Sequence, residues 1–302
     1  MYIKKIKGVG SLVKEVKRYR NAYIFISPFY ILFMIFGAFP ILYSFYLSFH
    51  QWRGFGPRDF VGLKNYINLL NDELFWVSLK NTAYMWFGHI FIMLLLALAL
   101  AIVLNSVTLR MKGFYRMTFY LPTCIAIVAV ALVFGVIYDT EYGVLNYVLN
   151  KIGIFRIPWI ASSKWSKNSI IILNIWRVVG WYMVILLAGL QTINTQLYEA
   201  AEIDGANPLQ RIWYITIPAL KPILFFCFII ETIGSFRIFT EPYVLTHGGP
   251  ANSSISMTLY LYNTAFQYFK FGYASAISFG LFGFVVMASW AQLRIWGRKS
   301  LG

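Results

Sequence analysis

Charged residues are scarce in this sequence of 302 residues. Only 12% of them are Asp, Glu, Lys or Arg, and just 11 are acidic, whereas roughly a quarter of residues are charged in an average soluble domain. Hydrophobic residues make up 59%, and the mean hydropathy is +0.65. A soluble fold of this length cannot hide so much apolar surface, so the composition excludes one and predicts a membrane protein.

The sequence also lacks the residue groupings of an enzyme or an ATP-binding protein. Its histidines, His50, His89 and His247, are far apart, so no metal site is expected, and His89 is interpreted as a packing residue. No glycine-rich loop ends in Lys followed by Ser or Thr, so no P-loop is present. Cys124 and Cys227 fall in apolar runs and are expected to be inert. We expect no catalytic residue, metal or cofactor in this chain.

Long apolar runs dominate the sequence instead. A helix needs about 20 apolar residues to cross a bilayer, and we count six such runs. They are 22–49, 82–104, 118–138, 169–189, 222–239 and 274–293. The first exceeds one straight span, so part of it is expected to lie among the lipid headgroups or to bend at Pro28 or Pro40. The predicted fold class is an all-α membrane protein with six transmembrane helices.

Basic residues set the expected orientation. The positive-inside rule places the segment before the first run in the cytoplasm, because it carries Lys4, Lys5, Lys7, Lys14, Lys17, Arg18 and Arg20. Six crossings return the C-terminus to the same side, in agreement with Arg110, Lys112, Arg116, Arg294, Arg298 and Lys299. The outer side fits less well, since it receives Arg53, Arg58, Lys64, Lys80, Lys151, Arg156, Lys164 and Lys167.

One membrane domain with two tails is the simplest partition. It comprises a basic cytoplasmic tail at 1–21, a transmembrane domain at 22–297 and a cytoplasmic tail at 298–302. No cleavable signal peptide is expected, because no small-residue cleavage site follows the first run. Residues 3–19 either form an amphipathic helix on the membrane surface or stay disordered. The net charge of +15 fits anionic-lipid contact at span ends and does not indicate nucleic-acid binding.

A polar island at residues 191–221 interrupts the apolar runs. Residues 199–202 (EAAE) favour a helix, and Asp204 with Gly205 ends it where the backbone turns to positive φ. Asn207 can cap a second short helix, with Gln210 in a capping-box position. The pattern predicts a helix–bend–helix elbow that another protein grips. The residues expected to make that contact are Glu199, Ala200, Ala201, Glu202, Asp204 and Gly205.

This island resembles the EAA loop of ABC-importer permeases, through residues 199–201, Gly205 and the pair Ile217 and Pro218. In that family the loop docks into a cleft on a cytoplasmic ATPase subunit and transmits its motion. The extended form, EAAEIDGA followed by ITIPAL, is similar to the carbohydrate branch, which includes permeases for maltose, glycerol-3-phosphate and multiple sugars. From spacing alone, a membrane-surface loop with solvated carboxylates remains an alternative.

Shorter matches to the same family follow in order along the chain. They are FVGLKNY (60–66), Asn81 with Thr82, FYLP (119–122), Gly143, Asn146, LAGL (187–190) and YVLTHGGP (243–250). In the first match, Leu63, Tyr66, Ile67 and Leu70 are expected to form the apolar side of a helix on the outer surface. The resemblance therefore implies the type I ABC importer permease fold.

The resemblance also implies the partners. They are a second homologous permease subunit, two cytoplasmic ATPase subunits that hold ATP and Mg, an external solute-binding protein, a carbohydrate substrate and membrane lipids. The implied location is the cell (inner) membrane, with both termini cytoplasmic. The chain itself is implied to be a non-catalytic permease that couples ATPase closure to alternating access. The alternative is a self-sufficient secondary transporter or channel, which the absence of inverted repeats and of an Asp, Glu and His relay makes less favoured.

Polar residues inside the apolar runs are candidates for a substrate route, because they are costly in a membrane. Asn174, Arg177 and Trp181 share one helical face, and Glu231 and Ser235 are one turn apart in the next run. Hydrogen-bonding groups beside an aromatic ring suit a carbohydrate. The competing interpretation is an interhelical clamp without substrate contact, for instance between Arg177 and Glu231.

Overall fold

The computed structural model describes residues 18–106 and 110–297. Most of the predicted basic tail lies outside these residues, including Lys4, Lys5, Lys7, Lys14, Lys17 and the helix considered for 3–19. Arg298, Lys299 and the tail at 298–302 also lie outside them.

Helices account for most of the described chain. Five are long and apolar enough to cross a membrane: Arg20–Ser48, Glu73–Asn105, Ser166–Leu190, Pro208–Phe236 and Phe271–Ile295. A sixth span is possible as a bent pair, α6 (Lys112–Cys124) with α7 (Ile127–Ile137), whose axes differ by 96°. The predicted helical membrane fold is confirmed, but the third span is bent and not a straight helix.

The bend lies at Ile125 and Ala126, which take extended backbone conformations between α6 and α7. Pro122, in the last turn of α6, has no amide hydrogen for a helical hydrogen bond. Every residue from 124 to 137 except Gly135 is apolar, so the hydrophobic run continues unchanged across the break. Apolar length alone therefore conceals the change of direction.

The first span runs through both of its prolines without a break. It consists of α2 (Arg20–Phe33), the π-helical turn η1 (Met34–Ala38) and α3 (Phe39–Ser48). Pro40 lies two residues beyond the end of η1, and a π-helical turn can accommodate the missing amide donor of a proline. Residues Arg20–Ser48 therefore form one long helix, with Pro28 inside α2 and the π-helical turn η1 ahead of Pro40.

Short elements cover the end of the spans that the sequence predicts to face outward. Strands β1 (His50–Gln51) and β2 (Asp59–Phe60) pair antiparallel, and α4 (Lys64–Leu70) follows them. The helix predicted near residue 66 is confirmed, but Leu63, Ile67 and Leu70 are exposed. Its packed side carries Asn65 and Leu69 instead, because the Asn65 amide donates to the carbonyls of Ser48 and His50.

The remaining elements complete the bundle. They are α5 (Glu73–Asn105), α8 (Val144–Lys151), α9 (Ser166–Leu190), α10 (Thr195–Ile203), α11 (Pro208–Arg211), η2 (Ile212–Thr216), α12 (Ile217–Phe236), η3 (Pro242–Thr246), α13 (Met257–Tyr262), η4 (Asn263–Gln267), α14 (Phe271–Gln292) and η5 (Leu293–Gly297). Buried side chains of α5, α9 and α12 form one apolar core. A second joins α7 to α9, and a third joins α4, α5, α13 and α14.

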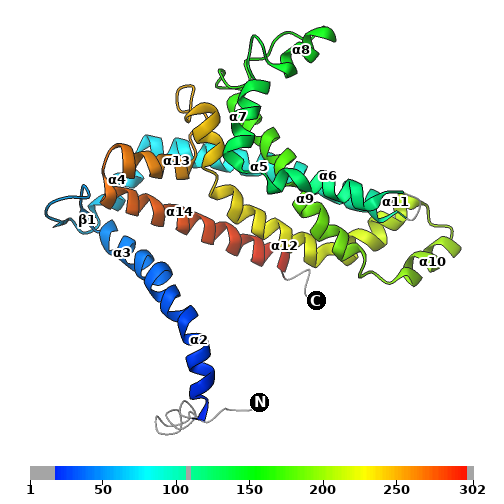
Figure 1. Cartoon of the computed structure of the whole chain (residues 1–302), viewed down its shortest axis with the longest axis horizontal. Helices are drawn as coiled ribbons and strands as arrows, with labels where there is room; N and C mark the ends of the chain where they lie inside the picture. Colours follow the sequence, from blue (N-terminus) through cyan, green and yellow to red (C-terminus); the bar gives the residue numbers. More distant parts are fainter. Residues whose placement is uncertain (1–17, 107–109, 298–302) are drawn as a thin grey trace.

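Figure 1 shows how these elements are distributed between the two ends of the bundle. The start of α2 lies at the bottom of the view, the end of α14 near its centre and the bend between α10 and α11 at its right. The β1–β2 hairpin lies at the left and α8 at the top, and α2 stands away from the other helices. Helix α14 runs from the neighbourhood of β1 toward the elbow, so its end and the elbow lie on the side away from the hairpin.

Candidate functional site

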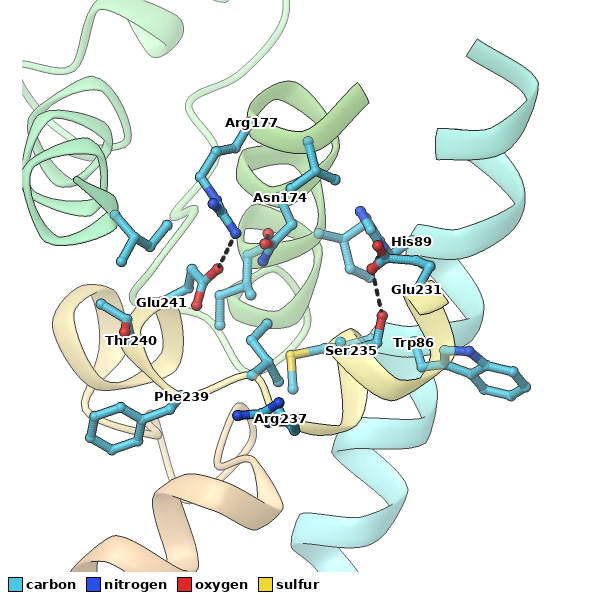
Figure 2. A pocket seen from close by; sticks show the side chains of 17 residues that line it. Trp86, His89, Asn174, Arg177, Glu231, Ser235, Arg237, Phe239, Thr240 and Glu241 are labelled. Carbon is cyan, nitrogen blue, oxygen red and sulfur yellow. Dashed lines mark hydrogen bonds and ion pairs between the residues drawn. The ribbon is translucent and has the colours of Figure 1, made fainter. Parts of the chain in front are cut away.

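A cavity opens among α5, α9, α12 and the segment that follows α12. Its volume is about 240 Å³, and polar side chains from each of these elements line it (Figure 2). They include Trp86, His89, Asn174, Arg177, Glu231, Ser235, Arg237, Thr240 and Glu241. Ionisable groups gathered around a cavity between membrane spans mark a candidate substrate site.

Four of the five residues predicted for the substrate route line this cavity: Asn174, Arg177, Glu231 and Ser235. Trp181 lies outside it, in a separate apolar groove between α6 and α9. There its indole stacks on Tyr120, with ring centroids 6.0 Å apart. Helix α6 packs against α9 and separates this groove from the cavity. Thr123 on α6 donates a hydrogen bond of 2.9 Å to the Arg177 carbonyl.

Glu231 connects two helices at the cavity wall. Its Oε1 accepts a hydrogen bond of 2.9 Å from Ser235 on the same helix and lies 3.1 Å from Nδ1 of His89 on α5. Both Glu231 and His89 are buried. A carboxylate removed from water requires such partners, so this contact holds α5 and α12 together at the level of the cavity.

Arg177 makes a different contact from the one considered in the clamp interpretation. Its guanidinium lies 4.0 Å from Oε1 of Glu241, and its Nε is buried without a hydrogen-bond partner. Glu241 is 5% exposed and lies beyond the end of α12. The suggested pair of Arg177 with Glu231 is not formed, because each of these groups faces a partner on another element (Figure 2).

Sequence reasoning overlooked His89 and Glu241 as members of this site. His89 was interpreted as a satisfied packing residue, but its Nε2 is buried without a partner. Glu241 falls two residues beyond the fifth apolar run. Their ionisable character within or next to an apolar run was the available signal. Their convergence on Glu231 and Arg177 depends on how the helices cross.

The predicted elbow, which lies within residues 191–221, has the local structure that the sequence indicates. Gly205 takes a φ of +78° and ends the first helix, α10. Asn207 and Gln210 form a complete capping box at the start of α11. The second helix is not short, however, because α11, η2 and α12 form one continuous helix, Pro208–Phe236. The π-helical η2 precedes Pro218 and accommodates its missing amide donor.

The carboxylates of the elbow differ in their contacts. Glu202 forms a 3.0 Å ion pair with Arg211, which ties α10 to α11. Glu199, Asp204, Ala200 and Gly205 are exposed, and Ala201 is half-buried. Ile203 is 87% exposed beside them. Within the described chain, Glu199 and Asp204 have no ion-pair partner, so two carboxylates and the exposed Ile203 are available to a partner protein.

Comparison with known sequences identifies the family. Residues 94–295 match the family described as binding-protein-dependent transport system inner membrane component. The chain belongs to this family. It is therefore a multi-pass membrane permease, and its part in transport is non-catalytic.

Relatives of this permease cover nearly its whole length. A lactose transport system permease protein from Rhizobium radiobacter is 38% identical over 285 residues, which span 92% of this chain and 95% of the relative. A trehalose/maltose transport system permease protein from Thermococcus litoralis is 33% identical, over 95% of this chain and 97% of the relative.

Solved structures support the same fold for the permease. A chain of a bacterial ABC transporter that imports the acidic polysaccharide alginate superposes with a TM-score of 0.81 at 26% identity, covering 94% of this chain and 99% of that one. A chain of an alginate ABC transporter in complex with a pentasaccharide-bound periplasmic protein gives a TM-score of 0.83 at 24% identity, over 95% and 97% of the two chains. Both matches confirm the ABC importer permease fold.

Proposed function

We propose that this permease carries a carbohydrate across the cell membrane as part of an ATP-driven importer. The related permeases named for lactose and for trehalose and maltose support this substrate class. The cavity supports it too, because amide, hydroxyl, guanidinium and carboxylate groups can match sugar hydroxyls with both donors and acceptors. Asn174, Arg177, Glu231 and Ser235 remain our candidates for the route, now joined by His89 and Glu241.

The elbow is proposed as the contact with a cytoplasmic ATPase subunit that holds ATP and Mg. One observation carries this proposal: the elbow helix α11 continues without interruption into α12, whose Glu231 and Ser235 line the cavity. A push on the elbow therefore displaces a wall of the cavity as one rigid body. Rigid-body motion of this kind is how alternating access is produced.

The proposed orientation follows from the elbow. ATP is cytoplasmic, so the elbow, the start of α2 and the end of α14 face the cytoplasm (Figure 1). Two ATPase subunits, one for each permease, bind on that side. The β1–β2 hairpin and α8 then face outward, where an external solute-binding protein delivers the substrate.

The coupling proposal predicts the effect of Glu199→Lys. Reversing a charge at the contact is expected to weaken the affinity for the ATPase subunit roughly tenfold, so the purified complex should retain less of that subunit. Gly205→Pro is expected to act in the same direction by disturbing the bend. Co-purification and substrate-stimulated ATP hydrolysis provide the measurement.

Glu73→Lys is the matched control, since Glu73 is an exposed acid at the opposite end of the bundle. It makes the same change of charge and should leave ATPase retention unaltered. Full retention and full coupled hydrolysis in Glu199→Lys and Gly205→Pro would refute the elbow contact. A native complex that has no ATPase and drives uptake from an ion gradient alone would refute the importer itself.

A further inference from the structure

The outer end of the molecule carries basic residues that the topology does not explain. Cations favour the cytoplasmic side of a membrane protein, yet many lie at the end opposite the elbow. Several of these have partners within the chain: Arg156 pairs with Glu141, Lys151 lies over the Tyr147 ring, and Lys167 lies over the Tyr84 ring. Arg53, Lys64 and Lys270 are exposed, and no such contact occupies them within the described chain.

These three cations surround one cleft. Its volume is about 430 Å³, and it lies between the β1–β2 hairpin, α4 and the start of α14. The lining consists of Gln51, Trp52, Arg53, Val61, Lys64, Asn65, Asn68, Asp72, Lys270 and Tyr273. The cleft thus presents three cationic groups from three separate segments to the outer solution.

The single carboxylate in the lining is already occupied. Asp72 Oδ1 accepts hydrogen bonds from the amides of Leu74 and Phe75, at 2.9 and 3.3 Å. Its Oδ2 accepts hydrogen bonds from the hydroxyls of Tyr260 and Tyr273. These four donors stabilise the negative charge from inside the protein. The nearby acids Asp59 and Glu73 are exposed and do not line the cleft.

The walls of the cleft are fixed in place. Asn65 donates to the carbonyls of Ser48 and His50, at 2.9 and 3.0 Å, and so holds α4 against the chain that enters the hairpin. Gly272 lies so close to β1 that a Cβ atom there would approach the His50 carbonyl oxygen to 1.9 Å. A preorganised surface loses little conformational entropy when a partner binds.

We propose that this cleft is the docking site for an acidic segment of the external solute-binding protein, an inference that rests on the proposed importer function. Three unpaired cations in a concave, rigid site complement a run of Asp and Glu side chains and accelerate encounter with an acidic partner. The exposed rings of Phe55 and Phe60 at the hairpin, 86% and 72% exposed, supply aromatic contact area around the charges. Aromatic residues are enriched in such interfaces.

The test uses the whole transporter in lipid vesicles and the purified, saccharide-loaded binding protein of the same transport system. ATP hydrolysis is measured as the concentration of that binding protein is raised. Lys64→Glu and Lys270→Glu are each expected to raise the half-maximal concentration about tenfold, while saturating binding protein restores the wild-type maximal rate. That restored rate shows that the variants are folded. Added salt should raise the half-maximal concentration of the wild type more than that of the variants.

Lys164→Glu is the matched control, because Lys164 is an exposed outer lysine outside the cleft. It should keep the wild-type half-maximal concentration and the basal hydrolysis rate. Equal half-maximal concentrations in the cleft variants and this control would overturn the docking site. The cleft variants could instead change only how ATP hydrolysis depends on the concentration of free saccharide. That result would also overturn the docking site and assign the cleft to an anionic sugar. A wild-type complex that no binding protein stimulates would instead refute the importer.

Discussion

Asp72 joins three helices at the end of the molecule that carries the β1–β2 hairpin. It caps the N-terminus of α5 and accepts hydrogen bonds from Tyr260 on α13 and Tyr273 on α14. Burial alone would raise the pKa of Asp72, but the hydrogen bonds from Tyr260, Tyr273, Phe75 and Leu74 outweigh it and lower that pKa below its usual value. The ionised form therefore stabilises the folded chain.

Replacing this carboxylate tests that role. Asp72→Asn keeps the side-chain shape but places an amide N–H₂ against one of the tyrosine hydroxyls, and we expect a loss of about 1–3 kcal/mol in the free energy of unfolding. Thermal unfolding of the purified chain followed by circular dichroism provides the measurement. Asp59→Asn is a control, since Asp59 is exposed. An unchanged midpoint in Asp72→Asn would contradict the assignment.

The same carboxylate predicts a pH dependence. A group whose pKa is lowered by folding contributes stability above its unfolded pKa, and this contribution is lost as the pH falls through the folded pKa. The difference between the wild type and Asp72→Asn should therefore be constant near neutral pH and shrink below about pH 4. A difference that grows on acidification would contradict the lowered pKa.

At the residue scale, the sequence was most informative where the interactions are local. Gly205 and the capping box of Asn207 with Gln210 depend on neighbours within four positions, and their geometry was predicted. The partner of Arg177 is 64 positions away in sequence and depends on the path of the chain after α12. No pattern along one helix contains that information, so the pairing suggested from the sequence was wrong.

Among the elements, helix positions could be predicted but not helix directions. Apolar length located every span, because burial in lipid requires it. The 96° bend between α6 and α7 was not predicted, although Pro122 marked its vicinity. The continuity of α11 with α12 was also missed, because the polar island was interpreted as two short helices. In the structure the π-helical η2 precedes Pro218 inside one long helix.

The contact between Arg177 and Glu241 ties α9 to the segment after α12, and its removal should be costly. Arg177→Met leaves the buried Glu241 without the cation beside it, and we expect a loss of about 1–3 kcal/mol in the free energy of unfolding. We expect a loss at the lower end of this energy range, because the Arg177 side chain is 25% exposed. The double variant Arg177→Met with Glu241→Gln removes both charges and should recover much of that loss. Unfolding midpoints of both variants provide the measurement, and a double variant no more stable than the single one would contradict the ion pair.

On the scale of the whole molecule, one chain leaves much of its apolar surface uncovered. The most apolar stretch of the first span has none of its residues buried, and α2 stands apart from the bundle (Figure 1). The part that packs is α3, next to β1, where Ser44 and Phe45 contact Ser275 and Phe279 on α14. A helix held at one end and free along the rest is suited to reach across to a neighbouring subunit.

We expect that neighbour to be the second permease, and cross-linking can test it. Phe25 and Phe36 are 85% and 75% exposed and lie roughly three turns apart on one side of the first span. Cysteines placed there, in a Cys124→Ser background because Cys124 is exposed, should be linked to the second permease by a short bifunctional thiol and photoreactive reagent. The same chain expressed without that subunit is the control. Strong labelling by a lipid-soluble thiol reagent in the assembled complex, without any cross-link, would show that lipid and not protein covers α2.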